Sequence, residues 1–460
     1  MTASTVHPVD LEPSLIAPRT YTSRRLQVRL DVATVIALLV CLLYMLPAAL
    51  IVPGLTFAGR PALVLALGLF AWWLLARLSP SLFVVGPQPL RWACLFYLAS
   101  ILLSYIAGLL RGLPTLEANR QNFTLLVTFE FIGLVLMSAD GIANWERLRK
   151  VLRVFIWAAA FMAAVGLIQS VFEYDIAQHL ILPGLEVKNE LADFQKRGEG
   201  GLFRVASTAF HYIEFSTVMA MAVPFGLHFA RFAPTTRGRR TFALLTLLIA
   251  AAVPVAISRT GVVALGAALA VMFVAAWNWR TRYNMLLISV VVLGGITVLR
   301  PGLLGTLKAM FLLADEDPSV TGRTDDYTMV SHWFSQRPWL GRGPGTLIPD
   351  LYIILDNQWL MTLVTGGIIG VLALATLHIT CLTQAYVALR RSTTEEDRHL
   401  CAALISSQVV AVLVAATFDS FNFTTFAFTL ALMSGLCGAV WRFTHPARII
   451  RTSTVKRLFE

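Results

Sequence analysis

The feature that most constrains this chain is a series of apolar runs, each close to the roughly 20 residues that cross a bilayer as a helix. Hydrophobic residues make up 57% of the 460 residues and charged residues only 14%, more apolar surface than a water-soluble core could bury. We therefore predict an all-α, polytopic membrane protein. Twelve spans are expected, although the second, seventh and ninth are short enough that a merged or re-entrant pair would change this number. They lie at residues 31–52, 61–77, 90–110, 121–138, 151–172, 211–230, 241–257, 260–278, 283–299, 357–378, 400–417 and 424–441.

The positions of the Lys and Arg residues predict the orientation, because short cytoplasmic loops retain positive charge. If the N-terminus lies inside, most of the 37 basic residues fall in the tails and the short inner loops. Most of the others fall in two long outer loops, where charge has little influence on topology. We expect both termini in the cytoplasm and interpret the net charge of +11 as membrane orientation. No basic tract interleaved with aromatic residues indicates nucleic-acid binding.

These patterns predict one transmembrane domain, residues 31–442, between cytoplasmic tails at 1–30 and 443–460. The first span is long and has no small-residue cleavage site, which indicates an uncleaved first helix. The five cysteines share no CxxC spacing, which argues against disulfides and against a zinc site. No metal or other cofactor is expected.

Two outer loops, about 173–210 and 300–356, interrupt the alternation of spans and short turns. Long loops with alternating charge, aromatic residues and Gly/Pro turns are usually ordered lids or binding surfaces. In the second loop we predict a short helix from Arg323 to Gln336, begun by a Thr-Asp-Asp capping signal and stopped by a proline. The GRGPG sequence at 341–345 could bring backbone amides close to an anion. It lacks the Lys and Ser/Thr of a nucleotide P-loop.

Asp356 and Asn357 stand at the outer start of the tenth predicted span. An Asp in this position can cap the helix N-terminus through its side-chain oxygen. A carboxylate there can also act as a general base that takes a proton from an attacking sugar hydroxyl. The two roles are compatible, because capping would fix the position of the side chain. Asp356 is the catalytic candidate and Asn357 a substrate-binding candidate.

Arg259 and Arg204, basic residues of the outer face, are the other two catalytic candidates. Arg259 lies in SRTG between two apolar runs, and Arg204 lies in GLFRVAST ahead of the sixth span. Each could be an anchor whose charge reaches the membrane surface. An outward arginine opposes the positive-inside bias, and a phosphate partner would explain it, since guanidinium binds phosphate oxygens bidentately. Arg323 and Arg342 are further substrate-binding candidates, although at least one arginine of their loop is expected to be structural.

Three other polar residues stand in or beside apolar runs. His211 and Glu214 are three residues apart and share one helical face, where we expect a hydrogen-bonded pair and a possible contact with substrate. A metal site is disfavoured because no further ligands stand nearby. Glu130 falls in the middle of the fourth span, where a carboxylate is costly and usually paired or functional. The sequence does not identify its partner.

The SRTG helix, the loop ending in RPWLGRGPG, and DNQWL followed by a Gly-rich apolar run resemble the O-antigen ligase and polymerase superfamily. The likeness in motifs spans about residues 195–375. The ligase pattern is a His followed by Asn, Ser or Gln, with Leu at the fourth position and Gly at the eleventh. The chain matches it at Asn357, Leu360 and Gly367, but has Asp356 where ligases carry the proposed catalytic His. This departure favours a polymerase over a ligase.

The resemblance implies a GT-C-like, metal-independent, inverting glycosyltransferase of the bacterial cytoplasmic membrane. Its donor would be a polyprenyl-diphosphate-linked glycan, its acceptor a glycan or lipid, and its active site would face outward. The arginines that engage the donor diphosphate would correspond to Arg259 and Arg204. Two alternatives remain, a secondary transporter, which Glu130 would favour, and a non-catalytic scaffold of envelope assembly.

Overall fold

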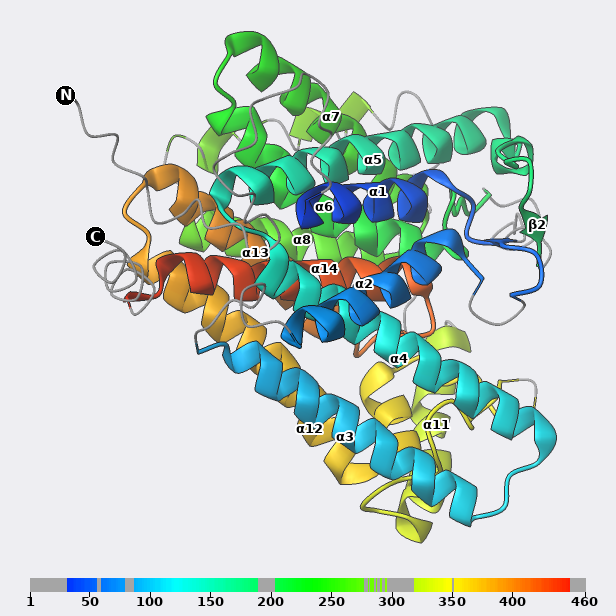
Figure 1. Ribbon diagram of the computed structural model, residues 1–460. Coiled ribbons are helices and arrows are strands. Elements are labelled where there is room, and N and C mark those ends of the chain that lie inside the picture. The colour runs from blue at the N-terminus through cyan, green and yellow to red at the C-terminus, as the bar shows by residue number, and fades with distance from the viewer. Residues whose placement is uncertain are drawn as a thin grey trace, which may run out of the picture.

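The computed structural model describes residues 31–55, 59–78, 87–188, 203–276, 318–349 and 351–446, with isolated positions between 280 and 295. These residues form a helical bundle (Figure 1), in which eight helices are long and apolar enough to cross a membrane. The eight are α3 (Pro89–Leu110), α4 (Thr115–Gly141), α5 (Trp145–Phe172), α6 (Tyr212–Phe232), α7 (Thr236–Val255), α12 (Gln358–Arg391), α13 (Glu395–Val414) and α14 (Thr424–Thr444).

Shorter elements complete the described part of the chain. Three are apolar helices, α1 (Val32–Met45), α2 (Pro61–Arg77) and α8 (Arg259–Ala275). Strands β1 (Leu50–Ile51) and β2 (Glu186–Val187) pair in antiparallel fashion, and a 3-10 turn, η2, covers Ile176–His179. Helix α11 (Pro318–Gln336) packs against α12.

The predicted polytopic helical architecture is confirmed, since each expected span except the ninth coincides with one of these helices. The ninth, 283–299, lies mostly outside the described residues, so the number twelve stays a prediction. Several boundaries differ from expectation. Helix α1 ends at Met45 instead of 52, and α4 and α5 begin at Thr115 and Trp145 instead of 121 and 151. Helix α12 continues past 378 to Arg391, and α11 begins at Pro318 instead of Arg323, although it ends at Gln336 as predicted.

Helix α14 forms the centre of the bundle and packs against α4, α6, α12 and α13. Its side chains are buried along most of its length, including Phe426 and Phe428. Large apolar side chains on peripheral helices point outward instead, among them Trp92 on α3 and Leu244 on α7. An outward apolar surface suits a bilayer, where lipid tails replace the water that a soluble protein would face.

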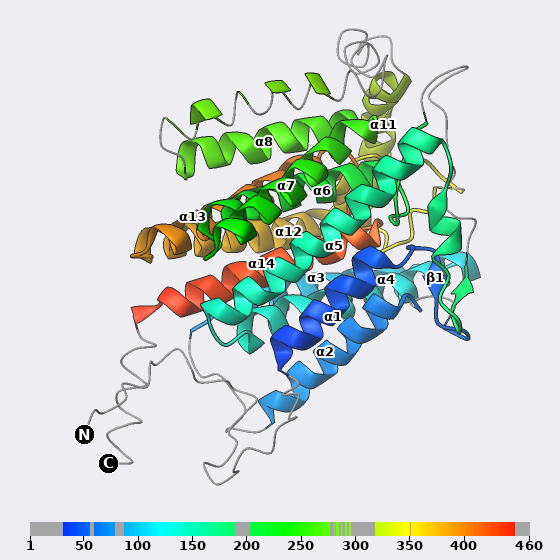
Figure 2. The ribbon, with the colours of Figure 1, turned by 90° about the horizontal axis from the view of Figure 1, so that it is seen from above.

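The bundle has two distinct ends. We call the end where α6, α8, α12 and α14 begin the Asp356 end; α11 and the β1–β2 pair also lie there (Figures 1 and 2). The opposite end, where α4 finishes and α5 begins, is the Asp140 end. The sequence-based topology assigns the Asp356 end to the outer face and the Asp140 end to the cytoplasm.

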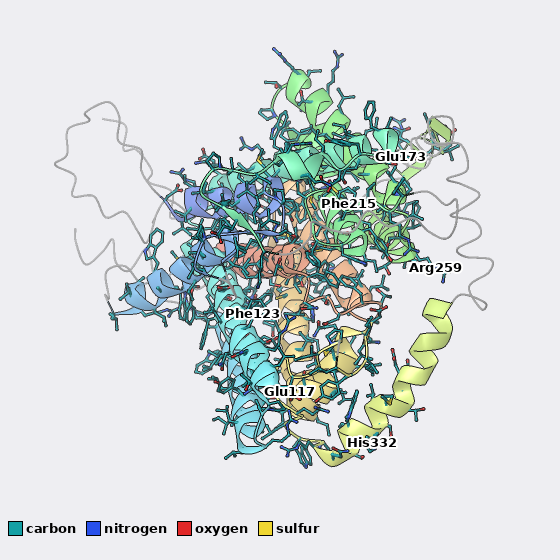
Figure 3. The ribbon with its side chains drawn as sticks, turned by 90° about the vertical axis from the view of Figure 1, so that its right-hand side faces the viewer. Glu117, Phe123, Glu173, Phe215, Arg259 and His332 are labelled. Carbon is teal, nitrogen blue, oxygen red and sulfur yellow. The ribbon has the colours of Figure 1, made fainter. Side chains whose placement is uncertain are left out.

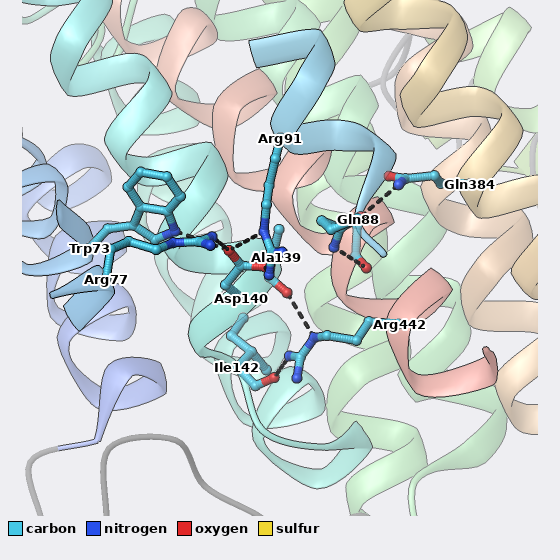
Figure 4. Close-up of polar contacts among 10 residues, drawn as sticks. Trp73, Arg77, Gln88, Arg91, Ala139, Asp140, Ile142, Gln384 and Arg442 are labelled. Atoms are coloured by element: carbon cyan, nitrogen blue, oxygen red, sulfur yellow. Dashed lines mark hydrogen bonds and ion pairs between the residues drawn. The ribbon is translucent and has the colours of Figure 1, made fainter. Parts of the chain in front are cut away.

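The Asp140 end holds a charged cluster that joins three helices (Figure 4). The Asp140 carboxylate accepts hydrogen bonds from Arg91 at 2.9 Å, Arg77 at 2.7 Å and Trp73 at 3.0 Å. Arg442 of α14 donates to the backbone carbonyl of residue 139 at 3.1 Å. Basic residues that the sequence places in inner loops therefore gather at one end, where Asp140 partly neutralises them.

Helix α12 is broken at Gly367, whose φ of 65° and ψ of −165° are not helical. A Cβ at this position would lie 2.3 Å from the backbone carbonyl carbon of Trp339, so only glycine fits. The Ile368 amide, which the break removes from the helical pattern, donates to the carbonyl of Pro338 at 2.8 Å. The loop after α11 thus fills the break and satisfies its backbone, as the apolar interior of a membrane requires.

The turn at 341–345 completes this contact from the other side. The amides of Arg342 and Gly343 donate to the carbonyls of Val364 and Thr365, at 3.0 Å each. These two amides are therefore engaged with α12 and are not directed at an anion in this structure. The turn holds α12 in its broken form instead.

Candidate functional site

Helix α12 begins at the Asp356 end with an acid and an amide side by side. The Asn357 Oδ1 accepts hydrogen bonds from the amides of Trp359 at 2.9 Å and Leu360 at 3.1 Å, which makes Asn357 the N-cap. Its Nδ2 donates to the carbonyl of Ala416 at 3.2 Å. Capping therefore belongs to Asn357 and not to Asp356. The half-buried Asp356 side chain stands one residue ahead of the helix.

The loop that joins α13 to α14, residues 415–423, folds over this helix start. The Gln358 amide donates to the carbonyl of Ala415 at 2.7 Å, and the Gln358 Oε1 accepts from the amide of Phe421 at 2.8 Å. The Phe421 ring also packs on aromatic rings of α3 and α4. The loop is thus fixed on both sides of its central residues.

Asp419 occupies the middle of this loop and is the neighbour of Asp356. It is half-buried, and burial together with the negative charge of Asp356 raises the pKa of Asp419 to about 7. Sequence reasoning did not select Asp419. The residue is visible in TFDSFNF between the last two spans, but nothing in the pattern connects it with Asp356.

Arg204, His211 and Tyr212 form a second cluster where α6 begins. Arg204 donates a hydrogen bond to the Tyr212 hydroxyl at 2.7 Å, and His211 Nδ1 caps α6 by accepting from the amide of Ile213 at 3.3 Å. Burial and the positive charge of Arg204 lower the pKa of His211 to about 4, so its imidazole is neutral at pH 7. The His211 ring lies 5.3 Å from that of Phe423, at the end of the 415–423 loop.

Glu214 differs from its expected role. Its carboxylate accepts the amides of Thr425 at 2.5 Å and Phe426 at 3.1 Å, and thereby caps α14 from a neighbouring helix. The other oxygen accepts the amide of Phe210 at 2.9 Å. The predicted hydrogen-bonded pair with His211 is therefore wrong, because backbone amides take both Glu214 oxygens. The fully buried side chain is a structural anchor between α6 and α14, and its predicted contact with substrate stays a prediction.

Arg259 is the first residue of α8, directly after the N-cap Ser258. A Cβ on Gly261 would meet the Ser216 side chain at 2.3 Å, so the start of α8 lies tightly against the start of α6. Figure 3 shows Arg259 at the edge of the helical body on the side where α11 lies. Arg259 and Arg204 therefore belong to the same end of the bundle as Asp356.

The helices that begin at this end include α6, α8, α12 and α14, and their N-termini carry partial positive charge. Contacts join them in a row: α8 to α6 at Gly261, α6 to α14 through Glu214, and α14 to α12 through the 415–423 loop. The row places Arg204 and Arg259 on the same end as Asp356 and Asp419. Such an arrangement can hold an anionic group beside a base.

Arg342 lies in a separate ion cluster around Glu117, which Figure 3 labels. Its guanidinium is 3.6 Å from the Glu117 carboxylate and stacks over the Tyr352 ring at 4.5 Å. Arg111 and the Tyr352 hydroxyl also donate to Glu117, which is 1% exposed. Arg342 therefore holds the second outer loop against α4, which agrees with the expectation that one arginine of this loop is structural. The Arg323 side chain lies outside the described residues.

Glu130 lies buried in the middle of α4, as the sequence predicts. Its Oε2 has no hydrogen-bond partner among the described residues. No group of three or more His, Cys, Asp or Glu in the described part of the chain is arranged to hold a metal ion.

A protein-family model described as O-antigen ligase matches residues 244–375. The match runs from within α7 to the middle of α12 and includes Arg259, Asp356 and Gly367. It confirms, over that part of the chain, the resemblance to the O-antigen ligase and polymerase superfamily. A search of curated proteins found no match.

Proposed function

From the O-antigen ligase region that this integral membrane protein carries, we propose that it is a glycosyltransferase acting at the outer face of a bacterial cytoplasmic membrane. It would transfer a glycan from a polyprenyl diphosphate to an acceptor glycan or lipid. One observation carries the proposal: the gathering of Asp356, Arg204 and Arg259 at one end of the bundle, within or beside the matched region.

The proposed reaction is an inverting displacement. Asp356 takes the proton of the acceptor hydroxyl, whose oxygen attacks the anomeric carbon of the donor sugar. The bond from that carbon to the diphosphate oxygen breaks, and the polyprenyl diphosphate leaves. Arg259 and Arg204 offset the negative charge that develops on the leaving group, aided by the helix N-termini around them. Asn357 fixes the backbone beside the base through its cap.

We favour a polymerase over a ligase. The motif of the ligases carries His where this chain has Asp356, while the remaining pattern, Asn357, Leu360 and Gly367, is kept. A carboxylate can still act as base, so the substitution changes the proton acceptor without removing it. An aspartate at the position of the ligase His therefore favours an enzyme that extends a glycan chain over an O-antigen ligase.

The test is deletion of the gene in its host, followed by complementation with wild type or Asp356→Ala. Loss of a general base costs about 10² to 10⁴-fold in rate, so single repeat units should accumulate in the deletion and in the variant. The measurement is the length distribution of lipid-linked and surface glycans. Full activity of Asp356→Ala would contradict the base assignment, with membrane insertion of the variant verified by immunoblot.

Other outcomes of the same experiment identify the competing functions. Full-length chains stranded on the polyprenyl carrier would indicate a ligase. Unchanged glycans would favour transport, for which the unpartnered Glu130 oxygen in the middle of α4 is the supporting observation.

A further inference from the structure

We propose that Asp356 and Asp419 form a carboxyl pair that holds a single proton at neutral pH, with Asp356 ionised and Asp419 protonated. This inference rests on the proposed function for its catalytic meaning, in which Asp356 is the base. Asp419 would be a positioning residue that acts through Asp356 and through the net charge of the site. The pairing itself is a property of the folded chain and can be tested without any glycan.

The geometry of the 415–423 loop brings the two residues together. Three hydrogen bonds tie the loop to the start of α12: Gln358 to Ala415, Asn357 to Ala416, and Phe421 to Gln358. They flank Asp419 on both sides and end on the two residues that directly follow Asp356. Neither residue can leave this arrangement unless the loop detaches from α12.

Aromatic packing also holds the loop against the core of the bundle. The Phe418 ring contacts Phe423 at 5.5 Å and Phe426 at 5.3 Å, between ring centroids. Phe418 is 1% exposed, so the residue next to Asp419 is buried in the core. Asp419 is therefore attached to a rigid part of the molecule and cannot relax far from a neighbouring charge.

Several charged groups near the loop are engaged with partners of their own. On α6, Glu214 is saturated by backbone amides, and His211 is neutral at pH 7. Arg204 interacts with Tyr212, and Arg60, ahead of α2, donates to Thr424 and Thr425 side chains and to the Leu43 carbonyl. Two close carboxylates in a partly buried site favour sharing one proton over carrying two charges. The raised pKa of Asp419 agrees with this.

The pair has a functional consequence because the proposed donor is a diphosphate. With one proton bound, the carboxyl pair carries one negative charge, and Asp356 can act as the base. Above about pH 7, Asp419 ionises as well, and two carboxylates would repel the anionic donor. The apparent KM for the donor should therefore rise in the alkaline range, and kcat/KM should fall.

The substrate-free test uses dicyclohexylcarbodiimide, an apolar reagent that adds to protonated carboxyl groups. Purified protein in lipid nanodiscs is labelled between pH 5.5 and pH 8.5, and the sites are mapped by mass spectrometry. Wild-type Asp419 should be modified at low pH, with modification lost around pH 7. In Asp356→Asn, the loss of the neighbouring charge should lower this midpoint by about one pH unit.

Controls separate pairing from a change of fold. Asp356→Glu keeps the charge and should keep the midpoint, which preserves the test if the asparagine variant folds poorly. Glu130, remote from the pair in the middle of α4, is an internal reference whose modification should be the same in every variant. An Asp419 that resists labelling at pH 5.5, or a midpoint unchanged in Asp356→Asn, would overturn the pairing.

An activity test addresses the positioning role separately. Asp419→Asn keeps a hydrogen-bond donor that cannot ionise, so glycan transfer by membrane vesicles should lose its alkaline decline. Asp175→Asn is the matched control: Asp175 is also half-buried and caps η2 at the same end of the bundle, and its variant should keep the wild-type pH profile. An unaltered alkaline limb in Asp419→Asn would reject the role. Absence of transfer in wild type, with normal labelling, would instead reject the proposed function.

Discussion

At the scale of single residues, helix capping and the proposed proton transfer belong to two neighbouring side chains, Asn357 and Asp356. Asn357 caps α12 with its Oδ1 and fixes the 415–423 loop with its Nδ2. Asp356 therefore does not cap α12, and its carboxylate stands one residue ahead of the helix. The short, rigid asparagine suits capping because its oxygen reaches two amides of the first turn.

Arg259→Lys tests whether the guanidinium binds phosphate as a fork. Lysine keeps the charge but loses bidentate geometry, so turnover should fall about tenfold to a hundredfold. The measurement is glycan transfer by membrane vesicles at matched protein levels. Arg237→Lys is the control, since Arg237 is exposed at the Asp140 end, far from the proposed donor. Equal turnover of Arg259→Lys and wild type would rule out a bidentate contact.

Glu117→Gln tests the ion cluster of the second outer loop. The change leaves Arg111 and Arg342 without the carboxylate that both contact. Removing one partner of a buried ion pair costs about 3 to 5 kcal/mol, so the melting temperature in detergent should drop clearly. Glu146→Gln on exposed α5 surface should cost about 0.5 kcal/mol or less. If Glu117→Gln lowers the melting temperature no more than Glu146→Gln does, the ion cluster contributes little to stability.

At the scale of elements, the broken helix α12 determines where the candidate base stands. The break at Gly367 separates the segment that begins beside Asp356 from the remainder of the helix. The loop at 338–343 supplies the hydrogen-bond partners that the break removes. The glycine at the eleventh position after Asp356 is thus explained by close backbone packing.

Gly367→Ala should destabilise the protein because its backbone conformation is restricted to glycine and the added Cβ would strike Trp339. The expected cost is about 1 to 3 kcal/mol or more, measured as a lower melting temperature together with loss of transfer. Gly366→Ala provides an adjacent control, since a Cβ there meets only the Thr362 methyl carbon at 3.9 Å. If both variants melt alike, close packing does not explain the glycine.

At the scale of the whole molecule, the two ends of the bundle carry different charged groups. Arg77 and Arg91 surround Asp140 at one end, and Asp356 lies with the N-termini of α6, α8, α12 and α14 at the other, where Glu117 holds a second ion cluster. This polarity agrees with the orientation that the basic loops predict. Both termini would then lie in the cytoplasm and the candidate site outside.

Cysteine labelling tests this orientation. Four of the native cysteines are buried and Cys41 is partly so, which gives a low background. Leu351→Cys, at an exposed position of the Asp356 end, should react with an impermeant maleimide on spheroplasts. Arg237→Cys, exposed at the Asp140 end, should react only after permeabilisation. The reverse pattern would invert the topology and place the candidate site in the cytoplasm.

The helical membrane fold, most span positions and the motif residues from Arg259 to Gly367 could be predicted from the amino-acid sequence. These are local properties: an apolar run of sufficient length must form a helix in lipid, because its backbone has no other hydrogen-bond partners. The same reasoning located Glu130 in the middle of a span. It could not separate the caps from the candidate catalytic groups, since both use short polar side chains at helix starts.

The pairing of residues distant in sequence came from the packing of the helices. It brought the 415–423 loop with Asp419 onto the start of α12, directed Glu214 to α14 and engaged Arg342 with Glu117. Each of these contacts connects elements far apart in sequence, and each depends on how the helices pack and where a loop crosses. Periodicity and charge along the chain do not predict such contacts. A polar residue at a helix end can bind many different partners, and the packing of the helices determines which partner is near.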